Sequence, residues 1–462
     1  MRNAKVDTEL EQKNLAKLLW QYSMPAIIAT VATSVYNIVD RIFIGQVVGP
    51  LAISGLTVTL PLMSVATAFG TLVGSGAASI TSIRMGEKRH DDALRTLANA
   101  LMLNVLIGMA ISAIGLLFLD EILMLFGASE LTLPYARTFM RIIFIGNPLS
   151  QLFFSLNTIM RASGYPAKAM WTVLLTMLVN LVLVVLLVYY MHIGIAGAAW
   201  ATVIGQVVGL VVVLVHFCNR NSHLHFKLFA FRPQWNIVER ILAIGMSPFI
   251  LHACSCIVVA LFNWQLKDYG GDYAIGAYGV INTVVNFVTV VVLGLSQGMQ
   301  PIVGYNFGAG NLNRVMRTLW MTILVGTVIT FIGFLCMTFM PRLIARCFTT
   351  DEVLSSLIVS GMRLYTIMFS FIGFQVVVSN FFQSIGMPRI SIFLSLSRQI
   401  VFLMPLLLVL PQKYGLTGIW CSMPVADFLA TIVAMVVLRY YYNKLPLENK
   451  LKEVPYEDIT AY

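Results

Sequence analysis

The sequence predicts an all-α integral membrane protein with twelve transmembrane helices, arranged as two six-helix lobes related by a parallel pseudo-two-fold repeat. Three observations predict this class. The chain of 462 residues is 58% hydrophobic and only 11% charged, whereas soluble domains carry roughly 25% charged residues. Its apolar residues gather in runs long enough to cross a bilayer, and the second half of the chain repeats the spacing of the first.

Each apolar run reaches about 20 residues or more, the length that a helix needs to cross a hydrocarbon core of ~30 Å. In the first half the runs are 18–44, 51–80, 96–119, 133–160, 169–191 and 195–217. In the second half they are 238–266, 274–303, 317–340, 358–384, 390–411 and 416–440. The N-terminal stretch before the first run is too polar for a signal peptide, so we expect the first run to be retained as a helix.

The charges between the runs predict the topology. Lys and Arg gather in the even-numbered gaps and in both tails, as in the second gap with Arg84, Lys88, Arg89 and Arg95. The odd-numbered gaps hold few basic residues and several acidic ones. The positive-inside rule therefore places both termini and the long gap 218–237 in the cytoplasm. The net charge of +10 reflects these juxtamembrane residues, and we predict no nucleic-acid partner.

An internal repeat divides the chain into two lobes. Several residues recur 222 positions later: Gly76, Gly86 and Arg95-Thr96-Leu97 as Gly298, Gly308 and Arg317-Thr318-Leu319, and Gly164 and Pro166 as Gly386 and Pro388. Because six helices is an even number, the two halves have the same orientation, which is the parallel repeat of many transporters. We predict an N-lobe at 1–217, a cytoplasmic linker at 218–237, and a C-lobe with a cytoplasmic tail at 238–462.

A polar stripe in the first run predicts a functional site. Thr33, Tyr36, Asn37 and Asp40 share one face of a helix at positions i, i+3, i+4 and i+7. A carboxylate at the middle of such a helix costs ~3 kcal/mol and usually marks an ion, proton or substrate pathway. We interpret Asp40 as a coupling site that alternates between H⁺ or Na⁺ and a cationic substrate. The structural alternative is a carboxylate paired with an unseen Arg or capping a break in the backbone.

Further polar residues can complete that site. In the fifth run, Thr172, Thr176 and Asn180 lie at intervals of four residues, with Met177 beside them. The sixth run adds Thr202 and Gln206, and the fourth run adds Asn157. Ordinary interhelical hydrogen bonds of ~0.6 kcal/mol each are the alternative. In the second half, Arg398 and Asp427 are the clearest opposite charges inside apolar runs. We predict that they form a structural ion pair.

Catalytic and metal-binding patterns do not emerge from the sequence. The six cysteines are scattered along the sequence. Cys254 and Cys256 are the only close pair, and they lie in an apolar run with no acidic neighbour. The histidines are not grouped with acids at the spacing of metal ligands, and no Ser or Cys nucleophile motif is present. We therefore predict that the protein is not an enzyme and holds no cofactor or metal.

The motifs resemble those of a known family. The segment Gly294-Leu-Ser-Gln-Gly-Met-Gln-Pro-Ile-Val-Gly-Tyr-Asn-Phe-Gly-Ala-Gly resembles the eighth-helix signature of the MATE family, multidrug and toxic compound extrusion. Asn157-Thr-Ile-Met-Arg-Ala-Ser-Gly, Asn180-Leu-Val-Leu, Phe382-Gln-Ser-Ile-Gly and Pro424-Val-Ala-Asp are also similar to its motifs. The resemblance covers residues 15–445, and the nearest branch is that of the MepA-like and DinF-like bacterial proteins.

The resemblance implies a V-shaped pair of lobes in the bacterial inner membrane that exports cationic amphiphilic compounds in exchange for H⁺ or Na⁺. It implies contact with drugs and membrane lipids, and we expect a monomer. It assigns coupling to Asp40, matches the family's polar network to Tyr36, Asn180 and Thr202, and places Asn157 near the drug. Together with the helical spacing above, we predict ion coupling by Asp40, Asn180 and Thr202, and substrate binding by Tyr36, Asn157, Met177 and Thr33. Related proteins often carry a second acid where this chain has Val184, and the acids of the NorM-like branch in the seventh and tenth helices are absent, so we favour H⁺ over Na⁺.

Two other functions compete with this reading. A flippase for a lipid-linked anionic sugar, from the same broad superfamily, would need a cavity lined by several arginines, and only Arg41 and Arg398 lie deep in the runs. A membrane-embedded enzyme or structural subunit is the third possibility, and the sequence displays no catalytic grouping that would support it.

Overall fold

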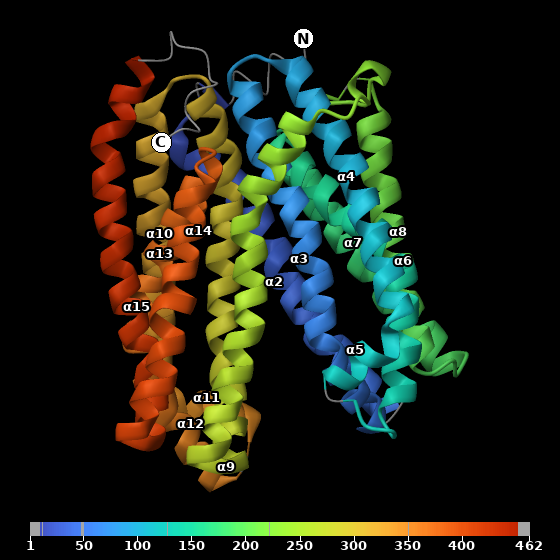
Figure 1. Ribbon diagram of the computed structural model, residues 1–462, viewed down its shortest axis with the longest axis vertical. Coiled ribbons are helices and arrows are strands. Elements are labelled where there is room, and N and C mark those ends of the chain that lie inside the picture. Colours follow the sequence, from blue (N-terminus) through green and yellow to red (C-terminus); the bar gives the residue numbers. More distant parts are fainter. Residues whose placement is uncertain are drawn as a thin grey trace.

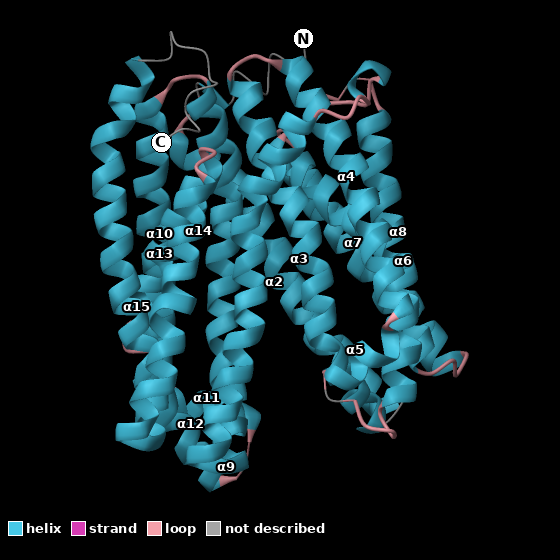
Figure 2. Cartoon of the chain, viewed as in Figure 1, coloured by secondary structure: helices cyan, strands magenta, loops and turns pink. Residues whose placement is uncertain are grey.

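The chain folds into a bundle of long helices. The computed structural model describes residues 10–11, 13–47, 50–126, 128–220, 222–349 and 351–450. Every regular element within these ranges is a helix, as Figure 2 shows. The all-α prediction is therefore confirmed.

Among its described residues, the first half contains six long helices and one short one. In order they are α2 (Leu15–Val47), α3 (Pro50–Gly86), α4 (His90–Leu117), the short α5 (Leu119–Leu125), α6 (Leu133–Ala162), α7 (Pro166–Val184) continued by the π-helical turn η1 (Val185–Tyr190), and α8 (Ile195–Cys218). A 3₁₀ turn, η2 (Leu228–Ala230), lies in the segment that follows.

The second half repeats this order. It contains α9 (Trp235–Gly308), α10 (Leu312–Phe339), the short α11 (Pro341–Phe348), α12 (Glu352–Tyr365), η3 (Phe369–Phe371), α13 (Ile372–Ser384), α14 (Pro388–Leu396), the π-helical η4 (Ser397–Leu403) and α15 (Met404–Lys450). The short helices α5 and α11 begin 222 residues apart, which is the offset of the repeat.

Two glycines divide helices that are too long for one crossing. Gly271 in α9 has φ 66° and ψ −167°, and Gly415 in α15 has φ 55° and ψ −136°. These left-handed conformations favour glycine. Both glycines fall in gaps that the sequence predicts between apolar runs.

The count of crossings follows from these breaks. Among the described residues, ten helices are long and apolar enough to span a membrane, and a bent pair makes an eleventh. One of the ten, Pro388–Tyr442, has 55 residues and would extend about 80 Å as a single helix. Because this length is more than twice the bilayer core and Gly415 interrupts it, it makes two crossings. The prediction of twelve transmembrane helices is thereby confirmed.

The tenth crossing differs from the continuous helix that its apolar run predicts. It consists of α12 and α13, bent by 52° where the helix is interrupted. At the bend, the Thr330 hydroxyl of α10 donates a hydrogen bond of 2.8 Å to the backbone oxygen of Ser370. A neighbouring side chain thus satisfies a carbonyl in the interrupted stretch, which is the condition for breaking a helix inside a membrane.

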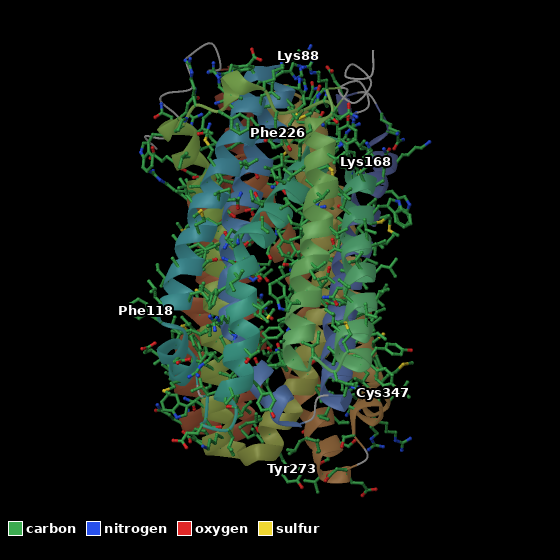
Figure 3. All side chains as sticks on the ribbon, turned by 90° about the vertical axis from the view of Figure 1, so that its right-hand side faces the viewer. Lys88, Phe118, Lys168, Phe226, Tyr273 and Cys347 are labelled. Atoms are coloured by element: carbon green, nitrogen blue, oxygen red, sulfur yellow. The ribbon has the colours of Figure 1, made fainter. Side chains whose placement is uncertain are left out.

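The helices form two groups that approach each other at one end of the molecule. Figure 1 shows α2–α8 and α9–α15 close together at the upper end and diverging toward the lower end. Lys88, Lys168 and Phe226 lie in the half toward the first of these ends, and Phe118, Tyr273 and Cys347 lie in the half toward the other (Figure 3). The even-numbered connections with their basic residues therefore share one end, which we call the basic end.

Three hydrophobic cores among the described residues explain this shape. The largest joins both halves and includes Leu156 of α6, Val303 of α9 and Phe381 of α13, all buried. A second core, around Phe262 and Tyr278, contains only residues of the second half. A third, around Phe139, contains only residues of the first half. The lobes thus share a core toward the basic end and keep separate cores toward the other.

The contact between the lobes is symmetric and depends on glycine. A Cβ atom placed on Gly86 at the end of α3 would lie 1.9 Å from the Tyr305 oxygen, and one on Gly308 would lie 2.1 Å from the Ile83 oxygen. Ile83 and Tyr305 are themselves 222 residues apart. The repeat therefore creates a self-complementary interface, like that between the subunits of a two-fold dimer.

Each lobe is entered through a segment that bonds to the other lobe. Before α2, the Arg314 guanidinium donates to the backbone oxygens of Leu10 at 3.2 Å and Lys13 at 2.8 Å. Before α9, the Asn99 amide of α4 donates to the Arg232 oxygen at 3.3 Å and its carbonyl accepts from the Gln234 N–H at 2.9 Å. These reciprocal bonds add to the closure of the basic end.

Candidate functional site

The candidate site lies on three helices of the first lobe, α2, α7 and α8, of which α7 contacts both others. The helix α2 packs against α7, and α7 packs against α8. Thr33, Tyr36 and Asp40 are on α2, Met177 and Asn180 on α7, and Thr202 on α8. The fold therefore brings the three helices that carry most of the predicted site residues together.

Asn180 and Thr202 form the centre of the described site. The Asn180 amide donates to the Thr202 hydroxyl at 3.2 Å, and that hydroxyl donates to the Ala198 oxygen at 3.0 Å. Asn180 is only 3% exposed. Its side-chain oxygen is buried and has no hydrogen-bond partner among the described residues. Since buried polar atoms are nearly always paired, such an atom requires an explanation.

A glycine permits this close contact between α7 and α8. A Cβ atom on Gly205 would lie 2.8 Å from the Thr176 oxygen and 3.2 Å from the Asn180 Cβ. Any larger residue would push α8 away from α7. Gly205 comes three residues after Thr202 on the same helix, so it keeps the Thr202 hydroxyl within reach of Asn180.

The residues on α2 are described only in part. Thr33 and Tyr36 are half-buried, and the Thr33 hydroxyl donates to the Ala29 oxygen at 2.7 Å. The backbone of Asp40 is helical, but its side chain and that of Asn37 lie outside the described part of the structure. The roles of Asp40, Thr33 and Tyr36 remain predictions.

Asn157 lies apart from the Asn180 pair. Its amide donates to the Ala169 oxygen at 3.0 Å and to the Thr172 hydroxyl at 2.6 Å, so it ties α6 to α7. Thr172 precedes Asn180 by eight residues, or ~12 Å along a helix. Met177 is half-buried and lies one turn from Asn180. The substrate-binding roles of Asn157 and Met177 remain predictions.

The second lobe contains a buried ion pair. Arg398 Nε donates to Asp427 Oδ1 at 2.7 Å, and the two side chains are 16% and 2% exposed. Arg398 lies in the π-helical η4, a kind of turn that often occurs at functional sites. The structure thus brings together the two charges that the sequence singles out.

Several polar contacts were not anticipated from the sequence. In the second lobe the hydroxyls of Ser247, Ser379, Ser391 and Ser395 form a connected cluster. Between the lobes, Arg161 donates to the Gln297 carbonyl, and the Gln300 amide donates to the Ser79 hydroxyl at 2.7 Å. The spacing of Ser391 and Ser395, one helical turn apart, is a signal that could have indicated the cluster. Nothing in the sequence shows that Arg161 faces Gln297.

Within the described ranges, no group of three or more His, Cys, Asp or Glu side chains could hold a metal ion. The described part of the site therefore consists of neutral hydrogen-bonding groups on the first lobe and one compensated charge pair on the second.

Comparison with known proteins identifies two copies of one family pattern. A sequence model of the MatE family matches residues 25–186 and 248–409, so the second match begins 223 residues after the first. This spacing agrees with the internal repeat. Together the two matches cover most of the chain.

Curated relatives match over nearly the full length. The multidrug export protein MepA of Staphylococcus haemolyticus is 27% identical over 441 residues, covering 95% of this chain and 96% of the relative. MepA of Staphylococcus aureus strain MRSA252 is 24% identical over 443 residues, covering 95% and 97%.

Solved structures share the fold. The MATE multidrug transporter DinF-BH, solved in complex with a ligand, is 32% identical, with a TM-score of 0.85 and coverage of 92% of this chain and 95% of that one. A MATE structure in complex with MaL6 has a TM-score of 0.90 at 22% identity, covering 95% of this chain and 99% of that one. The two-lobe architecture agrees with these structures.

Proposed function

The chain belongs to the MatE family of membrane transporters, and from that premise we propose that it exports cationic amphiphilic compounds in exchange for protons, with Asp40 as the coupling carboxylate. Two similar proteins support the class of cargo: MepA is named a multidrug export protein, and DinF-BH is a multidrug transporter solved with a bound ligand. A multi-pass bacterial membrane protein agrees with the family and with the apolar helices.

The unpaired oxygen of Asn180 is the observation that carries this proposal. A buried acceptor without a donor costs ~1–3 kcal/mol, and this one lies on α7, against which the Asp40-bearing helix packs. A protonated carboxyl can donate a hydrogen bond, whereas a carboxylate can only accept one. Protonation of Asp40 would supply the missing donor, and deprotonation would leave a negative charge for a cationic compound.

The coupling ion in this proposal is H⁺ rather than Na⁺. Val184 is 1% exposed and occupies the position where related proteins often place a second acid, one turn after Asn180. An apolar side chain there removes an oxygen ligand that a sodium ion would use. A proton needs only one titrating group, which Asp40 provides.

The two lobes supply the alternating access that exchange requires. They share one core toward the basic end and separate toward the other, so the arrangement is closed at the basic end. Rocking of one lobe against the other about the site is the usual cycle of transporters with repeats. Proton binding at Asp40 would favour one arrangement and the cationic compound the other.

The flippase alternative is less well supported. It needs several uncompensated arginines facing the cavity, but the charge of Arg398 is compensated by Asp427. The side chain of Arg41 lies outside the described residues. An anionic cargo would therefore meet a compensated charge at Arg398.

Transport in sealed vesicles tests the proposal. Ethidium movement would be measured under an imposed pH gradient and then under an imposed Na⁺ gradient, for the wild type, Asp40→Asn and Thr202→Val. We expect the pH gradient alone to drive the wild type, Asp40→Asn to abolish transport, and Thr202→Val to impair it by leaving the Asn180 amide unpaired.

Thr138→Val is the matched control. The Thr138 hydroxyl is exposed and donates only to the Pro134 oxygen one turn earlier, so its loss should leave transport unchanged. Unaltered ethidium movement in Asp40→Asn would refute the coupling role, and movement driven by Na⁺ alone would refute the choice of ion. Scrambling of a lipid-linked sugar without ethidium movement would establish the flippase instead.

A further inference from the structure

A cavity of about 340 Å³ lies between the beginnings of α2 and α10, away from the candidate transport site. It is lined by Lys13, Asn14, Leu15, Ala16, Arg314, Arg317 and Met321. Three of these residues are basic and none is acidic. Among the described residues, Glu11 interacts electrostatically with Arg314, and it does not line the cavity. The cavity therefore combines positively charged side chains with the apolar side chains of Leu15, Ala16 and Met321.

The internal repeat shows that this charge is particular to the second lobe. Arg317 corresponds to Arg95 at an offset of 222, and Arg314 corresponds to Asp92. In the first lobe Arg95 lies 3.9 Å from Asp92, so the basic charge has an acidic neighbour. In the second lobe an arginine takes the place of that acid. The scaffold alone does not require two arginines here, because the first lobe does without them.

The surroundings of the cavity place it at the membrane interface. Trp20 on α2 is 68% exposed and Trp320 on α10 is 49% exposed. Each comes three residues after a basic residue on its helix, Lys17 and Arg317 respectively. Exposed tryptophans beside basic residues mark the depth of lipid headgroups. An occupant of this cavity would thus have its polar part at the helix ends and its apolar part farther along the two helices.

We propose that this cavity binds the phosphate headgroup of an anionic phospholipid. The Lys13 ammonium donates one hydrogen bond to the Gln21 side chain at 2.6 Å, and an ammonium has three donors. The guanidinium of Arg317 and the ammonium of Lys13 would pair with the phosphodiester, since both groups are strong phosphate partners. Leu15 and Met321 would contact the apolar part next to the headgroup. Basic pockets between transmembrane helices on the cytoplasmic side suit such lipids, and the basic end is the predicted cytoplasmic end.

The site lies between the two lobes, so a bound lipid would affect how they are arranged. The helix α2 belongs to the first lobe and α10 to the second, and Arg314 already bonds to the backbone before α2. A ligand held by residues of both helices stabilises the arrangement in which they are close. Anionic lipid would therefore favour closure of the basic end, independently of which compound is transported.

Lipid binding to the purified full-length protein tests the proposal. Phosphatidylglycerol would be titrated into detergent or nanodisc samples, with phosphatidylcholine as the neutral comparison. Native mass spectrometry would count the bound lipid, and the thermal-unfolding midpoint would report stabilisation. We expect wild-type protein to retain phosphatidylglycerol selectively. Lys13→Gln with Arg317→Gln should weaken binding by about fivefold for each charge removed.

Arg95→Gln is the matched control, because it removes the repeat-related arginine at the same end of the molecule. It should leave phosphatidylglycerol binding unchanged. Equal retention of both lipids by the wild type, or retention by the double variant equal to that of Arg95→Gln, would overturn the proposal. Inorganic phosphate or glycerol phosphate that gave the same stabilisation as the lipid would also overturn it, in favour of a soluble anion. None of these readouts depends on transport.

Discussion

At the scale of single residues, the Arg398–Asp427 pair shows how charge is tolerated inside this protein. Two charges removed from water cost several kcal/mol each, and their attraction offsets that cost only when they are well placed. Here a bond of 2.7 Å joins them, and the Asp427 side chain is 2% exposed. The pair therefore stabilises the second lobe only while both members are present.

We predict that removing one member of this pair is costly. Asp427→Asn leaves Arg398 with a buried uncompensated charge and should lower stability by about 3–5 kcal/mol. Arg398→Gln combined with Asp427→Asn should recover part of this loss, because no net charge remains buried. The measurement is the thermal-unfolding midpoint in detergent for both single variants and the double variant.

The exposed pair of Arg137 and Asp120 provides the comparison. Its two bonds are 2.6 and 2.7 Å, but the side chains are 48% and 43% exposed. Solvent screens such a pair, so Asp120→Asn should change stability by about 1 kcal/mol or less.

For the buried pair, the double variant Arg398→Gln with Asp427→Asn should be more stable than Asp427→Asn alone. Equal stability of the two would show that Arg398 and Asp427 do not compensate each other's charge.

At the scale of helices, α3 packs so closely on α9 that their backbones touch at glycine positions, with no side chain between them. Gly86 meets the Tyr305 backbone and Gly308 meets the Ile83 backbone at equivalent places. Without a hydrophobic driving force in lipid, helices associate through such close packing and through interhelical hydrogen bonds. The Gln300–Ser79 bond lies on the same pair of helices.

Gly86→Ala should disturb this interface. The added methyl group would lie 1.9 Å from the Tyr305 oxygen, so the helices must separate, at a cost of about 1–3 kcal/mol. Thermal unfolding would measure the loss, and ethidium transport would show whether the lobes still work together.

The control is Gly279→Ala on α9, where an added Cβ meets nothing within 4 Å. Alanine there should be neutral or stabilise the helix by up to ~1 kcal/mol, because alanine has the higher helix propensity. If Gly86→Ala behaved like Gly279→Ala in both assays, close backbone contact would not be what holds α3 against α9.

At the scale of the whole molecule, the distribution of cores determines which end can open. One core serves both lobes toward the basic end, while each lobe has its own core toward the other end. Opening the basic end would expose part of the shared core and break the bonds of Arg314 and Asn99 to the entering segments. The proposed transport cycle requires such opening in each turnover.

A cross-link across the shared core should therefore stop transport. Ser79→Cys with Gln300→Cys would place thiols on α3 and α9, where the native side chains are 2.7 Å apart. In a background without the six native cysteines, a short thiol cross-linker should abolish ethidium transport, and reduction should restore it.

The control pair lies within one lobe. Ser247→Cys with Ser391→Cys replaces hydroxyls that are 2.8 Å apart, both in the second half. Cross-linking them should leave transport largely intact, because the lobes can still move relative to each other. Full transport by the cross-linked Ser79–Gln300 variant would argue against rocking about this interface.

Much of the fold could be predicted because the membrane restricts the choices. A run of about 20 apolar residues in lipid must form a helix, since every backbone polar group needs an internal partner. The breaks at Gly271 and Gly415 fall in the short gaps between apolar runs, where the chain leaves the lipid and need not continue as a helix. The break within 358–384 was not foreseen, because the Thr330 hydroxyl that bonds to the Ser370 oxygen comes from another helix.

The candidate site was predictable in its residue types but only partly in its contacts. The spacing of Asn180 and Met177 on one helix follows from the helical period. The bond from Asn180 to Thr202 depends on how α7 crosses α8, which Gly205 permits and no local pattern reports. Asn157 is buried, yet it bonds to Thr172 rather than to the Asn180 pair.

By itself, the sequence determined the helical class, the crossings, the two-fold repeat and the positions of charge that lipid makes expensive. These follow from hydrophobicity and periodicity, which are local properties. Only the tertiary structure decided which end the lobes share, which polar atoms meet and where basic residues from two lobes surround one cavity. Those outcomes depend on distances between residues far apart in the chain, which are set when helices from both halves pack together.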